Sequence, residues 1–312
     1  MAERKEFYFP SSDGKTSVHA VEWLPEGEAT GVLQLAHGVA EYALRYEAFA
    51  SFLAAHGFAV FANDHIGHGQ SVAPGAAPLY FGERDGWTHV VDDMRALRTL
   101  AAQRRPGLPY FLFGHSMGSF LARTYLIRYP GTVDGAVLMG TGQQPAALLA
   151  GGRLAASVIG RLRGFDRFSP FVNSLAFGAY NKPFAPARTN YDWLSADPEN
   201  VDAYIADPLC GAQATVGLFR DMLGGIAFLE APARLARMDK GTPVFFLSGA
   251  MDPVGDLGEG VKKACESFRR AGVRDVSLRL YPGLRHELLH EKERGQVFAD
   301  ILAWLEAHLG KS

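Results

Sequence analysis

The chain has 312 residues, of which 48% are hydrophobic and 21% are charged, and its formal net charge is −2. These proportions are typical of a folded globular protein and exclude a disordered, collagen-like or coiled-coil chain. The weak net charge gives no indication of a nucleic-acid partner. The length corresponds to two average domains or to one large α/β domain with an insertion.

The cysteines and the N-terminal residues indicate a compartment. Two cysteines, Cys210 and Cys265, are too few for a disulfide framework, so we expect free thiols in a reducing environment. Residues 1–6 are mostly charged and no apolar run follows them, so no signal peptide is expected. The longest uncharged stretch, 135–152, contains five glycines and a proline and would make a poor membrane span. We therefore predict a cytoplasmic protein, monomeric or dimeric.

Short apolar runs between turn signals predict the strands of a sheet. In chain order they cover 6–10, 17–23, 31–36, 58–62, 110–113, 135–139, 244–248 and 276–281. Segments with helical spacing of apolar residues occur at 46–56, 90–103, 117–129, 259–271 and 295–309. The first two strands alternate in polarity like a hairpin, and the later ones are continuous in apolar residues, as buried parallel strands are. The pattern predicts an α/β fold with a mostly parallel, eight-stranded, doubly wound sheet.

The alternation of strands and helices stops between residues 145 and 231, where almost no strand-like run occurs. This stretch contains helical fragments at 148–162, 168–176 and 216–229, and it is too long for a loop. We therefore expect a helical insertion at 145–231 that divides one α/β domain into parts at 1–144 and 232–312.

Apolar residues of the first helical fragment share one face, and they are Leu154, Val158, Ile159 and Leu162. Five arginines and one lysine against two aspartates give residues 145–193 a local charge of +4. Two interpretations stay open. In the first, the apolar face packs on the body of the protein and the arginines are solvated. In the second, the apolar face makes transient contact with a membrane or a micelle.

The sequence Gly114-His115-Ser116-Met117-Gly118 has the G-x-S-x-G pattern of a nucleophile elbow. A predicted strand precedes it and a predicted helix follows it, which is the context that this motif requires. Ser116 would then lie on a sharp turn at the end of the strand, with the N-terminus of the helix directed at the site. The alternative is a glycine-rich turn without chemistry.

A nucleophilic serine needs a general base, and the base needs a carboxylate that orients it. With this motif the acid and then the histidine follow in the chain, each after the C-terminal end of a later strand. Asp252 follows the strand at 244–248 and His286 follows the strand at 276–281. We therefore predict Ser116, Asp252 and His286 as the catalytic residues. The rival carboxylates and histidines are Asp239, Asp256, His290 and His308.

The loop after the strand at 31–36 begins with His37, Gly38 and Val39. A glycine in this turn lets the next amide point inward, so we expect the backbone N–H groups of Val39 and Met117 to form an oxyanion hole. We expect His37 to anchor the loop by a hydrogen bond. A metal site formed by His37 with the histidines of 63–71 is disfavoured, because these residues do not have ligand spacing on one element; no metal is predicted.

Three motifs together resemble the monoacylglycerol lipase and lysophospholipase branch of the α/β hydrolases. They are His37-Gly38…Glu41…Arg45-Tyr46, Asp64-His65-x-Gly67-His68-Gly69-x-Ser71 and the elbow at 114–118. The resemblance covers nearly the whole chain, and in the insertion it includes Asp197…Val201-Asp202…Asp207-Pro208-Leu209-Cys210. One departure is Ala40, where the family often has glycine.

The resemblance implies an α/β-hydrolase fold with a flexible helical cap over an acyl tunnel, and no cofactor. It also implies a triad of Ser116, Asp252 and His286 and an oxyanion hole at Val39 and Met117. It places the alcohol part of the ester near Glu41 and Arg45. The candidate substrate-binding residues are His37, Glu41, Arg45, Leu154 and Val158.

The predicted function is hydrolysis of a carboxylic ester through an acyl-enzyme, with a monoacylglycerol, a lysophospholipid or a small acyl ester as substrate. One alternative is an amide or peptide substrate. Acidic residues of the insertion would then bind the free amino terminus of that substrate. Others are acyl transfer to a second alcohol and a ligand receptor on the same fold. The acidic residues in question are Asp197, Glu199, Asp202 and Asp207.

Overall fold

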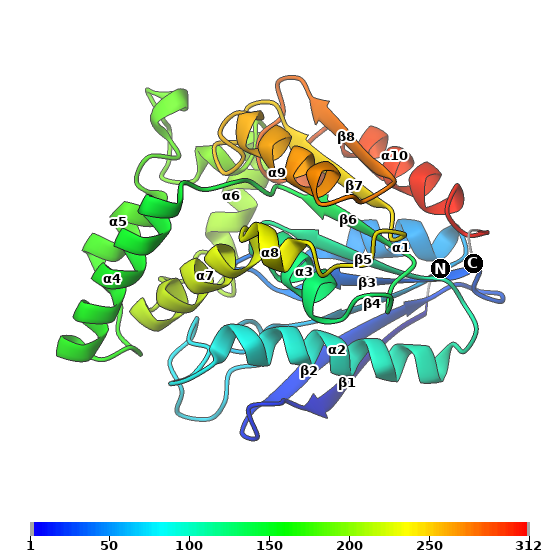
Figure 1. The fold of residues 1–312 in the computed structure, drawn as a ribbon, viewed down its shortest axis with the longest axis horizontal. Coiled ribbons are helices and arrows are strands. Elements are labelled where there is room, and N and C mark those ends of the chain that lie inside the picture. Colours follow the sequence, from blue (N-terminus) through cyan, green and yellow to red (C-terminus); the bar gives the residue numbers. More distant parts are fainter. Residues whose placement is uncertain (1–2, 311–312) are drawn as a thin grey trace.

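The structure, a computed structural model, describes residues 3–310 and is built on one eight-stranded sheet (Figure 1). The strand order is β1-β2-β4-β3-β5-β6-β7-β8. β2 is antiparallel to β1 and to β4, and every other neighbouring pair is parallel. This confirms the predicted α/β architecture. The strands are β1 (Glu3–Pro10), β2 (Ser17–Leu24), β3 (Gly31–Ala36), β4 (Phe58–Asn63), β5 (Tyr110–His115), β6 (Gly135–Met139), β7 (Val244–Gly249) and β8 (Val276–Tyr281).

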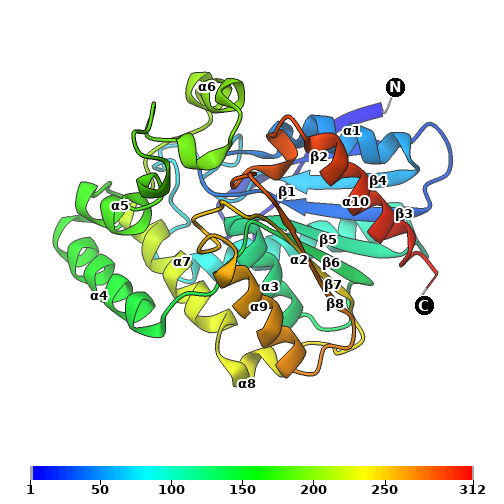
Figure 2. The ribbon, with the colours of Figure 1, turned by 90° about the horizontal axis from the view of Figure 1, so that it is seen from above.

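Helices cover both faces of the sheet (Figure 2). α1 and α10 pack on one face, and α2, α3 and α9 pack on the other. The helices are α1 (Glu47–Ala55), α2 (Gly86–Arg104), α3 (Met117–Arg128), α4 (Ala146–Arg163), α5 (Pro170–Phe177), α6 (Pro198–Ala206), α7 (Val216–Leu229), α8 (Pro232–Leu235), α9 (Glu259–Arg270) and α10 (Arg294–Glu306). Short 3₁₀ helices are η1 (Ala43–Tyr46), η2 (Lys182–Phe184), η3 (Asp192–Leu194) and η4 (Leu288–His290).

The central strands are buried on both faces, and β5 illustrates the pattern. Phe111 and Phe113 belong to the apolar cluster with α1 and α10, whereas Tyr110 and Leu112 belong to the cluster with α2 and α3. Successive side chains of a strand point to opposite faces, so a sheet covered on both sides needs apolar residues at every position. This explains why these strands appear in the sequence as continuous apolar runs. Because β5 to β8 pair in parallel, the C-terminal ends of β5, β7 and β8 lie at the same edge of the sheet.

Between β6 and β7 the described chain forms α4 to α8 and no strand, and we refer to residues 140–243 as the β6–β7 segment. Its helices α4 and α5 lie at the opposite end of the molecule from both chain termini (Figures 1 and 2). The three expected helical fragments correspond to α4, α5 and α7. Two further helices, α6 and α8, were not predicted, although Asp197 caps α6 by accepting a hydrogen bond from the Glu199 N–H.

The apolar face of α4 is mostly exposed. Leu154, Val158 and Leu162 are 66%, 45% and 79% exposed, while Leu149 and Ala156 are buried. The interpretation that this face packs on the body is therefore wrong for Leu154, Val158 and Leu162. None of the helices in residues 3–310 is long and apolar enough to cross a membrane.

Candidate active site

Ser116 lies on the turn that joins β5 to α3. Its φ of 53° and ψ of −122° are strained values for a residue other than glycine. A Cβ atom at Gly114 would overlap the carbonyl oxygen of Gly118, and one at Gly118 would overlap the carbonyl oxygen of Ala36. Close approach of the backbone is therefore the reason for both glycines of the G-x-S-x-G pattern.

Asp252 follows β7 and His286 follows β8, and their side chains are joined. His286 Nδ1 lies 2.9 Å from Asp252 Oδ2, and neither side chain is more than 2% exposed. Asp252 Oδ1 also accepts a hydrogen bond of 2.9 Å from the Val254 N–H. The rivals Asp239 and Asp256 have no hydrogen bond or ion pair with a histidine in the described chain; Asp239 instead binds the turn before β7.

The two rival histidines have other surroundings. His290 is buried without a hydrogen-bond partner on either ring nitrogen in the described residues, and burial lowers its pKa to about 4. His308 binds the carbonyl oxygen of Trp304 near the C-terminal end of α10, and its carboxylate partner is Asp275, which lines no cavity at Ser116. Of the histidines that follow β8, His286 is therefore the one joined to a carboxylate beside Ser116.

The protonation of His286 is set by opposing effects. Burial alone would lower its pKa, but the charge of Asp252 and the hydrogen bond to it outweigh burial and raise the pKa above the ordinary value. Ser116 and His286 line the same cavity. Ser116 Oγ has no hydrogen bond among residues 3–310, and such bonds are often long before a substrate binds.

The loop after β3 lies against Ser116. Val39 and Met117 both line a cavity at this serine. The Gly38 N–H donates to Glu41 Oε1, and Ala40 has a φ of 56°. Ala40 therefore adopts the left-handed conformation that favours glycine, which gives a physical reason for the glycine often found here in the similar family.

His37 anchors the start of this loop. Its Nδ1 lies 2.7 Å from the Gly38 carbonyl oxygen, and its Nε2 lies 3.0 Å from the backbone nitrogen of His65, which donates to it. Burial lowers the pKa of His37. The ring is fully buried and lines neither cavity at Ser116. Among residues 3–310, no group of histidine, cysteine or acidic side chains is arranged to hold a metal ion.

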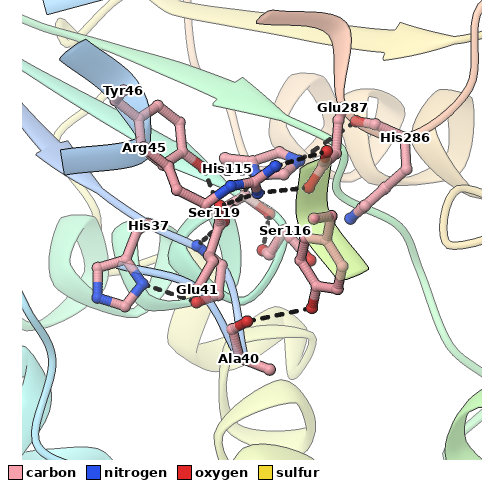
Figure 3. Close-up of polar contacts among 12 residues, drawn as sticks. His37, Ala40, Glu41, Arg45, Tyr46, His115, Ser116, Ser119, His286 and Glu287 are labelled. Atoms are coloured by element: carbon pink, nitrogen blue, oxygen red, sulfur yellow. Dashed lines mark hydrogen bonds and ion pairs between the residues drawn. The ribbon is translucent and has the colours of Figure 1, made fainter. Parts of the chain in front are cut away.

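Arg45 joins the loop after β3 to the loop of His286 (Figure 3). One guanidinium nitrogen lies 2.8 Å from Glu41 and 2.7 Å from Glu287, and Tyr46 OH donates to Glu41 at 2.7 Å. Burial would raise the pKa of both glutamates, but other effects lower it below the ordinary value. For Glu41 the main one is the hydrogen bond with His115, and for Glu287 it is the charge of Arg45. Glu287 was not predicted, although it is next to His286, and Tyr46 was named only as part of the family motif, without a role.

Two cavities meet at Ser116. One is polar, has a volume of about 450 Å³ and is lined by Glu41, His286 and Glu287 among others. The other has a volume of about 320 Å³ and is lined mainly by apolar residues of α4, α5 and α7. Phe177 and Trp193 line both. A third cavity, about 650 Å³ between α2 and α7, shares no lining residue with them.

Of the residues predicted to bind substrate, Glu41 lines a cavity at Ser116, and Arg45, Leu154 and Val158 do not. Glu41 lines the polar cavity, whereas Arg45 lies behind it and lines neither cavity. Leu154 and Val158 also line neither cavity; α4 contributes Leu148, Leu149 and its neighbouring glycines instead. The sequence also missed Phe177 and Trp193, because nothing local in the β6–β7 segment indicates which of its aromatic residues reach Ser116.

Comparisons with known proteins identify the family of this chain. Residues 27–293 match the family model described as serine aminopeptidase, S33. The chain is 33% identical to a monoacylglycerol lipase of Mycolicibacterium smegmatis over 98% of both chains. It is 30% identical to a monoglyceride lipase of Homo sapiens over 91% of this chain and 84% of the relative.

A solved structure agrees with the whole fold. A thermostable carboxyl esterase from Bacillus coagulans, in complex with glycerol, superimposes with a TM-score of 0.92 at 26% identity, covering 99% of both chains. Sequence and structure therefore agree from the first strands to the last helix. The chain belongs to the serine aminopeptidase S33 family and is a monoacylglycerol-lipase-like ester hydrolase with the α/β-hydrolase fold.

Proposed function

We propose that this chain hydrolyses monoacylglycerols or closely related acyl esters of neutral alcohols, with Ser116, His286 and Asp252 as a catalytic triad. The observation that supports this most is the buried hydrogen bond between His286 and Asp252, beside a serine on a strained turn where a polar and an apolar cavity meet.

In the proposed reaction Ser116 Oγ attacks the ester carbonyl carbon and its proton passes to His286 Nε2. Asp252 accepts the hydrogen bond of Nδ1–H and stabilises the imidazolium. When the bond between the carbonyl carbon and the alcohol oxygen breaks, His286 gives its proton to the departing alcohol. A water molecule then attacks the acyl-enzyme, with His286 taking its proton and returning one to Ser116 Oγ.

We assign the oxyanion hole to the backbone N–H groups of Val39 and Met117. Each such donor typically contributes about 2.7–4 kcal/mol of transition-state stabilisation. Glu41 accepts from the Gly38 N–H and so fixes the peptide between His37 and Gly38, one residue before Val39. Arg45 forms ion pairs with both Glu41 and Glu287, and Glu287 is next to His286. These ion pairs would fix the position of the loop after β3 relative to His286.

The two cavities suggest how the substrate lies. The apolar cavity suits the acyl chain, and the polar cavity suits the alcohol. Neither Lys nor Arg lines the polar cavity, whereas Glu41 and Glu287 do. An anionic phosphate would meet carboxylates there, so a neutral alcohol is favoured over the head group of a lysophospholipid.

The aminopeptidase alternative is less well supported. None of the four acidic residues that would hold a free amino terminus, Asp197, Glu199, Asp202 and Asp207, lines a cavity at Ser116. Asp202 pairs with Arg188, and Asp207 accepts a hydrogen bond from Tyr42 OH. Acyl transfer and ligand reception on the same site stay as alternatives.

We further propose that residues 145–231 form a cap whose outer face contacts a lipid surface. Exposed apolar side chains occur on α4 and α5, and exposed arginines accompany them at the end of α4, a combination suited to an anionic membrane surface. The apolar residues are Leu148, Leu154, Val158, Leu162, Phe171 and Leu175. Leu148 and Leu175 also line the apolar cavity, so this cavity borders the exposed face.

A single set of assays tests the proposed function. Wild type, Ser116→Ala and the control Ser267→Ala on α9 are compared on glyceryl and p-nitrophenyl esters with acyl chains of increasing length, and on a lysophospholipid. We expect Ser116→Ala to lose activity by at least about 10⁴-fold and the control to keep it. We expect the glyceryl ester to exceed the lysophospholipid of equal chain length at least tenfold in kcat/KM. Wild-type rates in Ser116→Ala would refute the triad.

A further inference from the structure

The polar cavity at Ser116 is larger than a glycerol leaving group needs. Its volume is about 450 Å³. At about 25 Å³ for each non-hydrogen atom, slightly less than the share of a water molecule in the liquid, glycerol fills roughly 150 Å³ and a hexose roughly 300 Å³. The cavity therefore has room for a hexose in addition to the ester group at Ser116.

The lining of this cavity includes side-chain carboxamides that form no hydrogen bond with other described residues. Asn173 on α5, together with Asn190 and Gln213 in loops, line it, and their side chains make no hydrogen bond within residues 3–310. Asn181, which also lines the cavity, differs because its amide binds the Thr189 carbonyl oxygen and the Trp193 N–H. An amide group both donates and accepts, so three uncommitted carboxamides match the several hydroxyl groups of a polyol.

Aromatic and charged side chains narrow the class of ligand. Tyr191 and Trp193 also line the cavity, and the Trp193 ring centroid is 5.1 Å from that of His286. Flat aromatic faces pack well on the C–H faces of a sugar ring, while the surrounding polar groups fix its orientation. The lining carboxylates of Glu41 and Glu287 are already bound to Arg45, which leaves neutral polar groups, the amides and the Ser174 hydroxyl, to bind a ligand.

We propose that this cavity is a subsite for a neutral polyol larger than glycerol, and that the chain hydrolyses monoacyl hexoses in addition to monoacylglycerols. The inference rests on the proposed function, because the reaction is the same. The bond between the carbonyl carbon and the hexose oxygen breaks, His286 gives its proton to that oxygen, and water releases the acid from Ser116. Asn173, Asn190 and Gln213 bind the sugar hydroxyls.

The experiment compares three esters with one acyl chain, 6-O-decanoylglucose, 1-decanoylglycerol and p-nitrophenyl decanoate. They are given to wild type, Ser116→Ala, the triple variant Asn173→Ala/Asn190→Ala/Gln213→Ala, and the control Gln103→Ala, an exposed amide on α2. We expect wild type to hydrolyse the glucose ester with a kcat/KM within about tenfold of the glyceryl ester. At about threefold for each lost hydrogen bond, the triple variant should lower the glucose-to-glyceryl ratio of kcat/KM at least tenfold, and the control should leave it unchanged.

The outcomes separate the two proposals. If the glucose ester is hydrolysed only at the Ser116→Ala rate while the glyceryl ester is hydrolysed well, the inference is wrong and the proposed function survives. If all three esters react only at the Ser116→Ala rate, the proposed function itself fails. An unchanged ratio in the triple variant also overturns the inference. Continued hydrolysis of the glyceryl ester by that variant shows that it folds.

Discussion

At the scale of single residues, the base His286 owes its charge state mainly to Asp252. Burial favours the neutral ring, and the carboxylate of Asp252 reverses that preference, so the pKa of His286 is raised. A base must be neutral to take the proton of Ser116. We therefore expect activity to fall as pH decreases through a pKa above 6.5. We expect Asp252→Asn to move this acid limb of kcat/KM to lower pH, because the largest charge that opposes burial is then removed while the smaller effects of Glu41 and Glu287 remain. The same variant should lose about 10³–10⁴-fold in kcat.

The matched control is Asp256→Asn in the same loop. Asp256 has a φ of 51°, which asparagine tolerates well, and it does not contact His286 among the described residues. Profiles of kcat/KM from pH 5 to 9 on p-nitrophenyl butyrate give the measurement. An acid limb in Asp252→Asn at the wild-type pH would show that Asp252 does not set the charge of His286.

At the scale of elements, the sequence predicts what local patterns determine. β3, β6, β8 and α7 begin and end where expected, because burial on both faces or one apolar stripe is visible in the residues themselves. The positions of Asp252 and His286 follow from those strands. The contacts of Trp193 and Glu287 could not be predicted, because they depend on how a helical segment folds back over the sheet. The same reason explains the wrong packing interpretation for Leu154 and Val158.

The exposed face of α4 gives a prediction at this scale. Leu154 and Val158 have few contacts to lose, so Leu154→Ser/Val158→Ser should leave the fold intact. Burying two such side chains in lipid contributes about 2–3 kcal/mol, and we expect at least a tenfold loss of binding to anionic phospholipid vesicles, with a matching loss of activity on long-chain esters in those vesicles. Ile205→Ser on α6 is the control, since Ile205 is a similarly exposed apolar residue. Equal vesicle binding by wild type and the double variant in a sedimentation assay would count against a lipid-contacting face.

At the scale of the whole molecule, Asp93 joins the first hairpin to the helical layer. It lies on α2, is 1% exposed, and accepts hydrogen bonds of 2.7 Å from both Ser11 Oγ and the Ser12 N–H in the turn between β1 and β2. Burial raises the pKa of Asp93 to about 6 from an ordinary value of 3.8. Between these values the folded state binds more protons than the unfolded state, so this group makes the protein less stable as pH rises from about 4 to 6.

Replacing Asp93 with asparagine removes that titration while keeping an oxygen that can accept from the Ser12 N–H. A difference of about two pKa units corresponds to about 3 kcal/mol, so the free energy of unfolding of Asp93→Asn relative to wild type should increase by about 2–3 kcal/mol between pH 4 and pH 6.5. Urea unfolding at a series of pH values measures this. A difference between variant and wild type that does not change with pH would mean that the Asp93 carboxyl keeps its ordinary pKa in the folded protein. In that case the contact between the hairpin and α2 would be equally strong throughout this range.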